Sequence, residues 1–165
     1  MNDIVKIAID GPVAQVTLNR PDKANALNLE MFDAIGDAGQ QLAANPSVRA
    51  VVLHGAGPNF CGGIDVEMFR GSEAIADAES MLPAKPSPAN RFQLAAYAWR
   101  ELPVPVICAI DGVAYGGGLQ IALGADLRYA APDARLSIME IKWGLIPDMA
   151  ISTTLRNILP LDQVK

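Results

Sequence analysis

The sequence is poor in the residues that bind metals and form disulfides. It has one histidine, His54, and two cysteines, Cys61 and Cys108, in 165 residues. No Cys-x-x-Cys or His-x-x-x-His spacing occurs, so we expect no metal site. The cysteines are expected to be free thiols in a reducing compartment. A hydrolase of the Ser-His-Asp type would need His54, which ends a strand-like run without a motif partner, and this counts against that class.

Positive charge and long apolar runs are scarce as well. Lys and Arg number 13 against 18 Asp and Glu, a formal net charge of −5, so we expect no nucleic-acid partner. The apolar run Val104–Ile110 is much too short to span a membrane. The first residues, Met1-Asn2-Asp3, lack the basic start and apolar stretch of a signal peptide. These features predict a cytoplasmic protein with no membrane partner.

What the sequence does contain is a succession of strand-like and helix-like segments. Hydrophobic residues make up 51% of the chain and charged residues 19%, which is typical of a globular domain with a core. Apolar alternation or short apolar runs predict strands over residues 4–9, 13–18, 50–54, 104–110, 126–130 and 136–138. Helical spacing and end signals predict helices over residues 28–44, 66–70, 91–101, 119–123 and 149–155. This order predicts one α/β domain over residues 1–165 with a mostly parallel sheet.

Two stretches differ from this pattern. Residues 71–90 carry several Ser and Ala residues and three closely spaced prolines, Pro83, Pro86 and Pro88, and we interpret them as a mobile surface segment or lid. The last residues, 161–165, resemble the first turn of a helix that is cut short after Pro160. This ending favours a fragment whose C-terminal part is missing.

Glycine gathers in two turns, each after a strand-like run. The runs are Gly62-Gly63-Ile64-Asp65 and Tyr115-Gly116-Gly117-Gly118. Bare backbone at a strand-to-helix turn exposes free N–H groups, which can hold a developing negative charge. The pair of turns therefore suggests two N–H donors that converge on one oxygen atom. The alternative is that each turn simply needs glycine for its backbone conformation.

Three polar residues could complete such a site. Glu140 lies between the apolar Met139 and Ile141, which favours a protected carboxylate able to carry a proton, although an exposed Glu at a strand end remains an alternative. Asp148 is a second candidate acid, and its alternative role is to cap the following helix. Gln120 can hold a water or a carbonyl but cannot accept a proton as a carboxylate does.

Taken in order, these residues resemble the crotonase superfamily, the enoyl-CoA hydratase/isomerase family. The resemblance covers almost the whole chain, and its specificity comes from the ordered set of motifs. The matching stretches are Asn19-Arg20-Pro21, Phe60-Cys61-Gly62-Gly63-Ile64-Asp65, Tyr115-Gly116-Gly117-Gly118, Glu140 and Gly144-Leu145-Ile146-Pro147. The resemblance implies a core of repeated ββα units in a spiral. It also implies an acyl-CoA substrate, with coenzyme A as part of that substrate and no separate cofactor.

The resemblance further implies roles for single residues. The N–H groups of Ile64 and Gly117 would form an oxyanion hole for the thioester oxygen, and Glu140 would move the proton. The loop Lys23-Ala24-Asn25-Ala26 would run along the CoA, with backbone groups of Ala24 and Ala26 near the adenine. Lys23 and Arg20 are candidate phosphate partners, with surface solvation as the alternative. The remaining expected substrate-binding positions are Gly62, Gly63, Asp65 and Gly116.

The chain departs from the family pattern at Gln120, where hydratases carry the first of two glutamates. We therefore expect double-bond isomerisation, with Glu140 as its acid/base, rather than hydration. Asp148 falls where dienoyl-CoA isomerases carry an Asp. A non-catalytic acyl-CoA-binding protein is the main alternative, and a serine hydrolase on a similar core is the weaker one. Full-length members of the family are expected to form homotrimers or hexamers.

Overall fold

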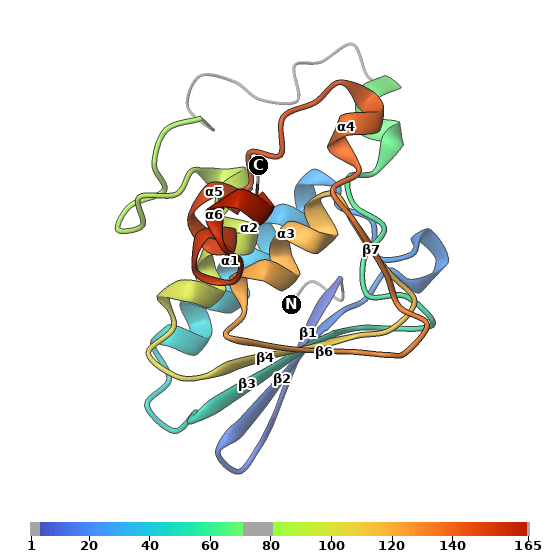
Figure 1. Ribbon diagram of the computed structural model, residues 1–165. Coiled ribbons are helices and arrows are strands. Elements are labelled where there is room, and N and C mark those ends of the chain that lie inside the picture. The colour runs from blue at the N-terminus through green and yellow to red at the C-terminus, as the bar shows by residue number, and fades with distance from the viewer. Residues whose placement is uncertain (1–3, 71–80, 165) are drawn as a thin grey trace.

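A five-stranded sheet forms the base of this computed structural model, which describes residues 4–70 and 81–164 (Figure 1). Its strand order is β1-β2-β3-β4-β6. The bounds are Val5–Asp10 for β1, Val13–Leu18 for β2, Ala50–Gly55 for β3, Val106–Ile110 for β4 and Leu127–Ala130 for β6. Strands β1 and β2 form the predicted antiparallel hairpin, and every other neighbouring pair is parallel. The prediction of a mostly parallel sheet is confirmed.

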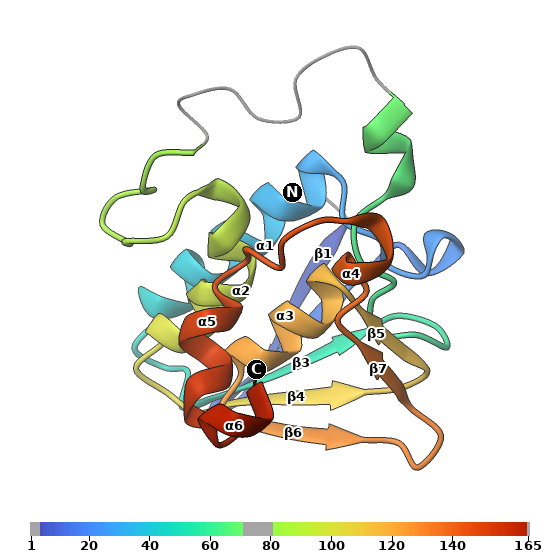
Figure 2. The same cartoon turned by 45° about the horizontal axis from the view of Figure 1, so that its top comes forward.

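A second, two-stranded sheet lies beyond the ends of the large one, as Figure 2 shows. It pairs β5 (Val113–Tyr115) with β7 (Arg135–Ser137) in parallel. Strands β4 and β5 lead into helix α3 (Gly117–Gly124), and β6 and β7 lead into α4 (Glu140–Trp143). Each unit thus sends one strand to each sheet before its helix. These two consecutive ββα units confirm the predicted spiral core.

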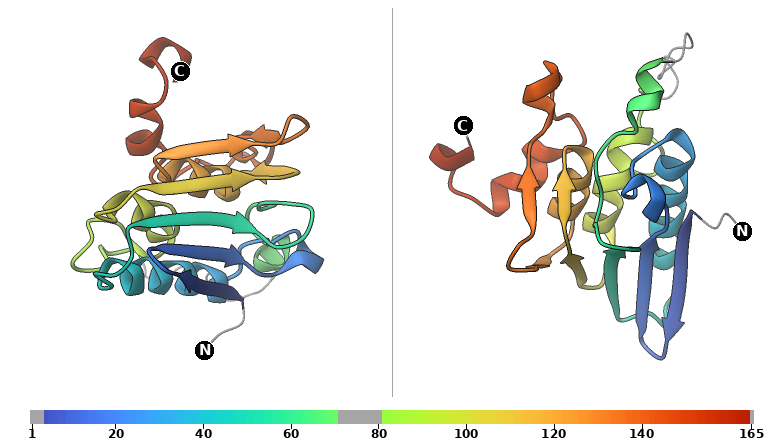
Figure 3. Two further views of the ribbon diagram at one scale, coloured as in Figure 1. Left: turned by 90° about the horizontal axis from the view of Figure 1, so that it is seen from below. Right: turned by 90° about the vertical axis from the view of Figure 1, so that its right-hand side faces the viewer.

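Helices α1 (Leu29–Ala43), α2 (Arg91–Glu101) and α3 lie together on one face of the large sheet (Figures 1 and 3). Helix α1 begins where predicted, because the Asn28 side chain accepts a hydrogen bond from the Met31 N–H. Its buried residues recur at helical spacing. They are Met31, Phe32, Ile35, Gly36, Ala38, Gly39 and Leu42. They pack on the alternate strand residues that face the helices, such as Val16, Leu53 and Cys108.

Some boundaries differ from the predictions. Strand β4 begins at Val106 rather than residue 104, after Pro105, which has no N–H to donate to a ladder. Helix α3 begins at Gly117, two residues before the predicted Leu119, so the glycines are its first turn. The helix predicted over 149–155 is α5 (Ile151–Thr154) followed by the 3-10 helix η3 (Leu155–Asn157), and α6 (Leu161–Val164) forms the predicted last turn.

The remaining short elements are η1 (Pro21–Lys23) and η2 (Val66–Arg70). Residues 71–80 of the predicted lid lie outside the described residues. The rest of that stretch, residues 81–90, folds back on itself, because Pro83 and Asn90 form an antiparallel bridge and the Ala84 N–H bonds the Ala89 carbonyl. Among the helices of the described residues, none has the length and apolar character needed to cross a membrane.

Candidate active site

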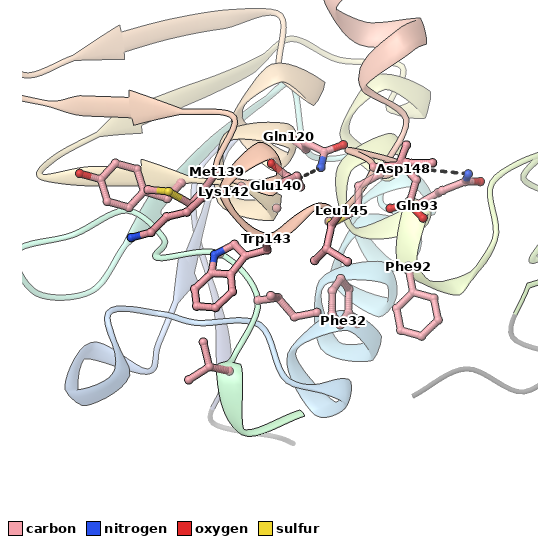
Figure 4. Close-up of a pocket in the computed structure, with 18 of the residues that line it drawn as sticks. Phe32, Phe92, Gln93, Gln120, Met139, Glu140, Lys142, Trp143, Leu145 and Asp148 are labelled. Atoms are coloured by element: carbon pink, nitrogen blue, oxygen red, sulfur yellow. Dashed lines mark hydrogen bonds between the residues drawn. The ribbon is translucent and has the colours of Figure 1, made fainter. Parts of the chain in front are cut away.

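Both glycine turns open into one pocket of about 710 Å³, shown in Figure 4. The pocket brings together residues that lie far apart in the sequence. The predicted site residues on its wall are Gly62, Gly63, Ile64, Gly116, Gly117, Gln120, Glu140 and Asp148. The remaining predicted positions, Lys23, Ala24, Ala26 and Asp65, are not part of this wall.

The two glycine turns lie against each other because their backbones pair. The Cys61 N–H bonds the Val113 carbonyl at 2.9 Å, and the Tyr115 N–H bonds the Cys61 carbonyl at 3.0 Å. Gly63 has a φ of +93°, and a Cβ there would lie 2.7 Å from the Tyr115 carbonyl oxygen. No residue other than glycine fits such an approach without a shift of the backbone. The chain therefore holds these two turns side by side.

The contacts that hold the two turns in place do not use the Ile64 and Gly117 N–H groups. Leu27 pairs with the Ile64 segment through the Gly63 carbonyl and the Asp65 N–H. The Gly63 carbonyl and the Ile64 N–H belong to one trans peptide group, so they point in opposite directions. The Ile64 N–H therefore faces away from Leu27. Gly117 is the first residue of α3, so its N–H has no acceptor within that helix.

Gln120 and Glu140 form a direct side-chain contact at this wall. The Gln120 Nε2 donates to Glu140 Oε1 at 2.6 Å, as the dashed line in Figure 4 shows. Gln120 is only 2% exposed. Its Oε1 and the Oε2 of Glu140 are both buried, and neither has a hydrogen-bond partner among the described residues. A buried acceptor without a donor is costly, so two of them on residues that line one pocket indicate a place for a hydrogen-donating ligand or water.

Glu140 stands over the second glycine turn. It is the first residue of α4, rather than a residue at the end of a strand, and it is half-buried. A Cβ on Gly116 would lie 3.4 Å from Glu140 Oε1, so the carboxylate sits directly above the turn that precedes the Gly117 N–H. The two apolar sequence neighbours of Glu140 do not shield its carboxylate equally, because Ile141 is 85% exposed. The protection of Glu140 comes from its tertiary contacts.

Asp148 lies on the pocket wall, but it is more exposed to solvent than Glu140. Its side chain is exposed, and its carbonyl accepts a hydrogen bond from Gln93 Nε2 at 3.2 Å (Figure 4). The cap of helix α5 is Ala150, not Asp148. The alternative role of Asp148 as a helix cap is therefore wrong, because the helix begins later than its position requires.

The loop that follows Arg20 is fixed by internal contacts. Arg20 donates to the Ala26 carbonyl and to Asp65 Oδ2, so the expectation of a solvated surface residue is wrong for Arg20. The Ala24 carbonyl accepts a bond from the Gly62 N–H at 2.8 Å. Lys23 is exposed and pairs with Glu67 at 2.9 Å. The hydrogen bond and charge of Glu67 raise the pKa of Lys23, so Lys23 stays cationic.

Asn25 ties this loop to the first glycine turn. Its side chain is fully buried, and its Nδ2 donates to the carbonyls of Ala56, Asn59 and Phe60. Its Oδ1 accepts the Arg20 N–H at 2.8 Å. Asn tolerates the φ of 54° found here better than most residues do. This one amide thus fixes the segment that leads into Gly62 and Gly63.

Comparison with known proteins decides what this arrangement belongs to. Residues 8–165 match the model of the family described as enoyl-CoA hydratase/isomerase. The chain belongs to that family. The relatives include a 1,2-epoxyphenylacetyl-CoA isomerase of Escherichia coli (strain K12), 34% identical over 90% of this chain and 55% of that protein. A probable enoyl-CoA hydratase of Bacillus subtilis (strain 168) is 32% identical over 88% of this chain and 54% of that protein.

Solved structures of family members agree with the fold. A Thermobifida fusca YX protein, crystallised in complex with acetoacetyl-CoA, superposes with a TM-score of 0.81 and 28% identity. The superposition covers 98% of this chain and 64% of that one. The chain spans about half the length of the curated relatives that it matches.

Other pocket residues of this family member were not predicted from the sequence. Phe32, Phe92, Trp143, Leu145 and Met149 line the wall. Phe32 and Phe92 lay on predicted apolar helix faces, where a pocket wall has the same pattern as a core. Trp143 carried a usable signal, because a large aromatic residue three positions after Glu140 is close to the candidate acid in any helical turn.

The other reactive side chains stand apart from this chemistry. Cys61 and Cys108 are free thiols, as expected, and the structure buries both, which raises the pKa of each thiol to about 12. His54 bonds the Thr17 hydroxyl at 3.0 Å across the sheet. None of these three residues lines the pocket. The described residues also hold no group of three or more His, Cys, Asp or Glu that could bind a metal.

Proposed function

We propose that the protein is an acyl-CoA isomerase of this family that moves a carbon–carbon double bond through a thioester enolate. The observation that carries the proposal is the buried Glu140 Oε2, which has no hydrogen-bond partner among the described residues and stands over the Gly116 turn. The acyl-CoA ligand of the Thermobifida fusca relative supports the substrate class. Coenzyme A enters as part of the substrate, and no further cofactor takes part.

The N–H groups of Ile64 and Gly117 hold the thioester oxygen. Two preorganised donors stabilise the negative charge that develops on that oxygen, and this makes the adjacent C2 hydrogen acidic. Support comes from the pairing of the two turns and from the absence of a helical acceptor for the Gly117 N–H. Gly62, Gly63 and Gly116 let the thioester approach the backbone closely.

Glu140 moves the proton. Its free Oε2 takes a proton from C2 of a 3-enoyl-CoA, the electron pair shifts through C3, and a proton is returned at C4. The C2–H bond breaks and a C4–H bond forms, so the reaction needs no oxidant or water. Gln120 orients the carboxylate by occupying Oε1, which leaves one oxygen for the substrate.

Gln120 also sets the preference for isomerisation. Hydration requires one group to activate a bound water and a second group to transfer another proton. An amide cannot exchange that proton. Asp148 is the second acid/base, exposed at the pocket wall. In its protonated form it gives a proton to C4, and the proton that Glu140 has taken from C2 then passes back to Asp148 through solvent, so both carboxyl groups end as they began.

The CoA part of the substrate runs along the loop of Lys23, Ala24 and Ala26. This loop is fixed by Asn25 and by the Arg20–Asp65 pair, so it is preorganised for a long ligand. Lys23 can bind a phosphate only if it breaks its ion pair with Glu67. Asp65 is paired with Arg20, so it affects the substrate only by positioning the Arg20 side chain. The family member acts in the cytoplasm, in line with its two free thiols.

The test measures 3-enoyl-CoA isomerisation and 2-enoyl-CoA hydration side by side. In Glu140→Gln we expect an isomerisation kcat at least about 100-fold lower, since positioned acid–base groups contribute on that scale. Asp148→Asn should lower kcat less. Glu101→Gln, an exposed site at the end of α2, is the matched control. Circular dichroism checks that each variant is folded.

Survival of both rates in Glu140→Gln would exclude the proposed role of Glu140. Binding of CoA thioesters in calorimetry without any turnover would instead favour a non-catalytic acyl-CoA-binding protein. This is the second candidate function, because the neutral Gln120 stands where an acid would be needed for hydration. Covalent labelling by a fluorophosphonate would indicate a serine hydrolase.

A further inference from the structure

Aromatic residues gather on one side of the pocket. Four of the nine aromatic residues in the chain line it, and Phe32, Phe92 and Trp143 lie across the pocket from the Gln120–Glu140 pair in Figure 4. Leu145 projects between the two sides. Polar groups that can act on a thioester are thus at one end, and aromatic rings are at the other.

Two of the rings are already fixed. Phe32 and Phe92 come from α1 and α2, and their ring centroids lie 5.2 Å apart with an interplanar angle of 86°, an edge-to-face pair. Phe32 is 2% exposed, so its ring is held by the core. Asn90 and Gln93 form a capping box at the start of α2, which fixes the backbone that carries Phe92. A ligand that binds against this pair does not have to immobilise the two side chains, so no entropy cost arises from ordering them.

Trp143 is the third ring, and it is uncovered. Its side chain is 61% exposed although it lines the pocket, and the Lys142 Nζ lies 6.0 Å from its ring centroid. Rings prefer edge-to-face or offset contact with other rings, and such pairs gain affinity beyond the apolar area that they bury. A straight alkyl chain gains affinity only from the apolar area that it buries.

We propose that the acyl group bound here carries an aromatic ring, which sits among Phe32, Phe92 and Trp143 while the thioester lies near Glu140. The inference rests on the proposed function, because it assigns the acyl end of the same acyl-CoA site. Trp143 and Phe92 are the residues that discriminate a ring from a straight chain.

Calorimetry with phenylacetyl-CoA, octanoyl-CoA and free CoA tests the inference. The two acyl groups have the same number of carbon atoms and no double bond to isomerise, so binding is read without catalysis. We expect phenylacetyl-CoA to bind about two- to ten-fold more tightly than octanoyl-CoA. Trp143→Leu and Phe92→Leu should each reduce this ratio and leave the octanoyl-CoA affinity nearly unchanged. Tyr129→Leu, which replaces an exposed aromatic residue on β6, should leave the ratio unchanged.

The outcomes separate this inference from the proposed function. Equal or tighter binding of octanoyl-CoA overturns the aromatic assignment alone, and so does a ratio that survives both Trp143→Leu and Phe92→Leu. If free CoA and both thioesters all fail to bind, the acyl-CoA assignment fails and this inference fails with it.

Discussion

At the scale of single residues, the buried polar side chains near the pocket have two different roles, ligand contact and loop positioning. Glu140 Oε2 and Gln120 Oε1 are buried and have no partner among the described residues, so they are available to a ligand. The polar atoms of Asn25 are buried too, but its amide bonds three carbonyls and one N–H, so its role is to hold the loops. Burial alone therefore does not mark a candidate functional residue, whereas a buried polar atom without a partner calls for an explanation such as a ligand or water.

The Arg20–Asp65 pair predicts a pH dependence of stability. Burial raises the pKa of Asp65, but the Glu67 N–H and the Arg20 guanidinium together outweigh it, so the net pKa lies below its usual value. The folded state therefore holds this proton less tightly than the unfolded state. The stabilisation is complete above the ordinary carboxyl pKa of about 3.9 and is lost as the pH falls through the lower folded value.

Urea unfolding of the wild type and of Asp65→Asn measures this effect. We expect the wild type to be more stable by about 1 kcal/mol at neutral pH, and the difference should shrink below about pH 3. Asp133→Asn, at an exposed turn position, is the control and should show no such trend. A stability difference that grows as the pH falls would contradict a lowered pKa of Asp65 in the folded state.

At the scale of elements, the start of α2 links stability to the pocket. The Asn90 side chain accepts bonds from the N–H groups of Phe92 and Gln93, and the Gln93 side chain bonds back to the Asn90 N–H. We expect Asn90→Ala to lower the free energy of unfolding by about 1 kcal/mol, because two helix donors lose their acceptor.

Thermal and urea unfolding check this prediction, and Asn90→Asp is the matched variant because it keeps the acceptor. Since Phe92 and Gln93 belong to this first turn, Asn90→Ala should also weaken acyl-CoA binding more than Asn90→Asp does. Equal stability of the two variants would show that the cap contributes nothing.

At the scale of the whole molecule, several large apolar residues are exposed late in the chain. They are Leu127 and Tyr129 on β6, Leu136 on β7, Ile138 before α4 and Ile141 within it. Strand β6 is also an edge of the large sheet. Exposed apolar residues on an unpaired sheet edge favour association, so we expect this edge surface of β6 to contribute to the trimer or hexamer expected of full-length family members.

Light scattering tests this association. We expect a mass that is a multiple of 17.4 kDa, and a decrease toward the monomer in Tyr129→Lys because a buried charge is costly at an interface. Leu29→Lys, an exposed apolar position on α1, is the control and should keep the assembly. A monomeric wild type at all concentrations would exclude self-association through this surface.

The sequence by itself determined most of the local structure and marked some of the residues that line the pocket. Apolar periodicity predicted most elements of the fold, and glycine after a strand marked both turns, because these signals depend on neighbours within a few residues. The ordered motifs also indicated the family. The boundary errors at Val106 and Gly117 arose where proline and glycine have no side-chain pattern to read.

Only the tertiary structure decided which of these participants meet. The contact of Gln120 with Glu140, the burial of Arg20 against Asp65 and the aromatic side of the pocket each join segments that are distant in the chain. Side-chain periodicity shows which face of an element is apolar, but not what packs on it. That is settled when two sheets and their helices come together, because the approach of backbones at Gly63 and Tyr115 fixes where every neighbouring side chain can lie.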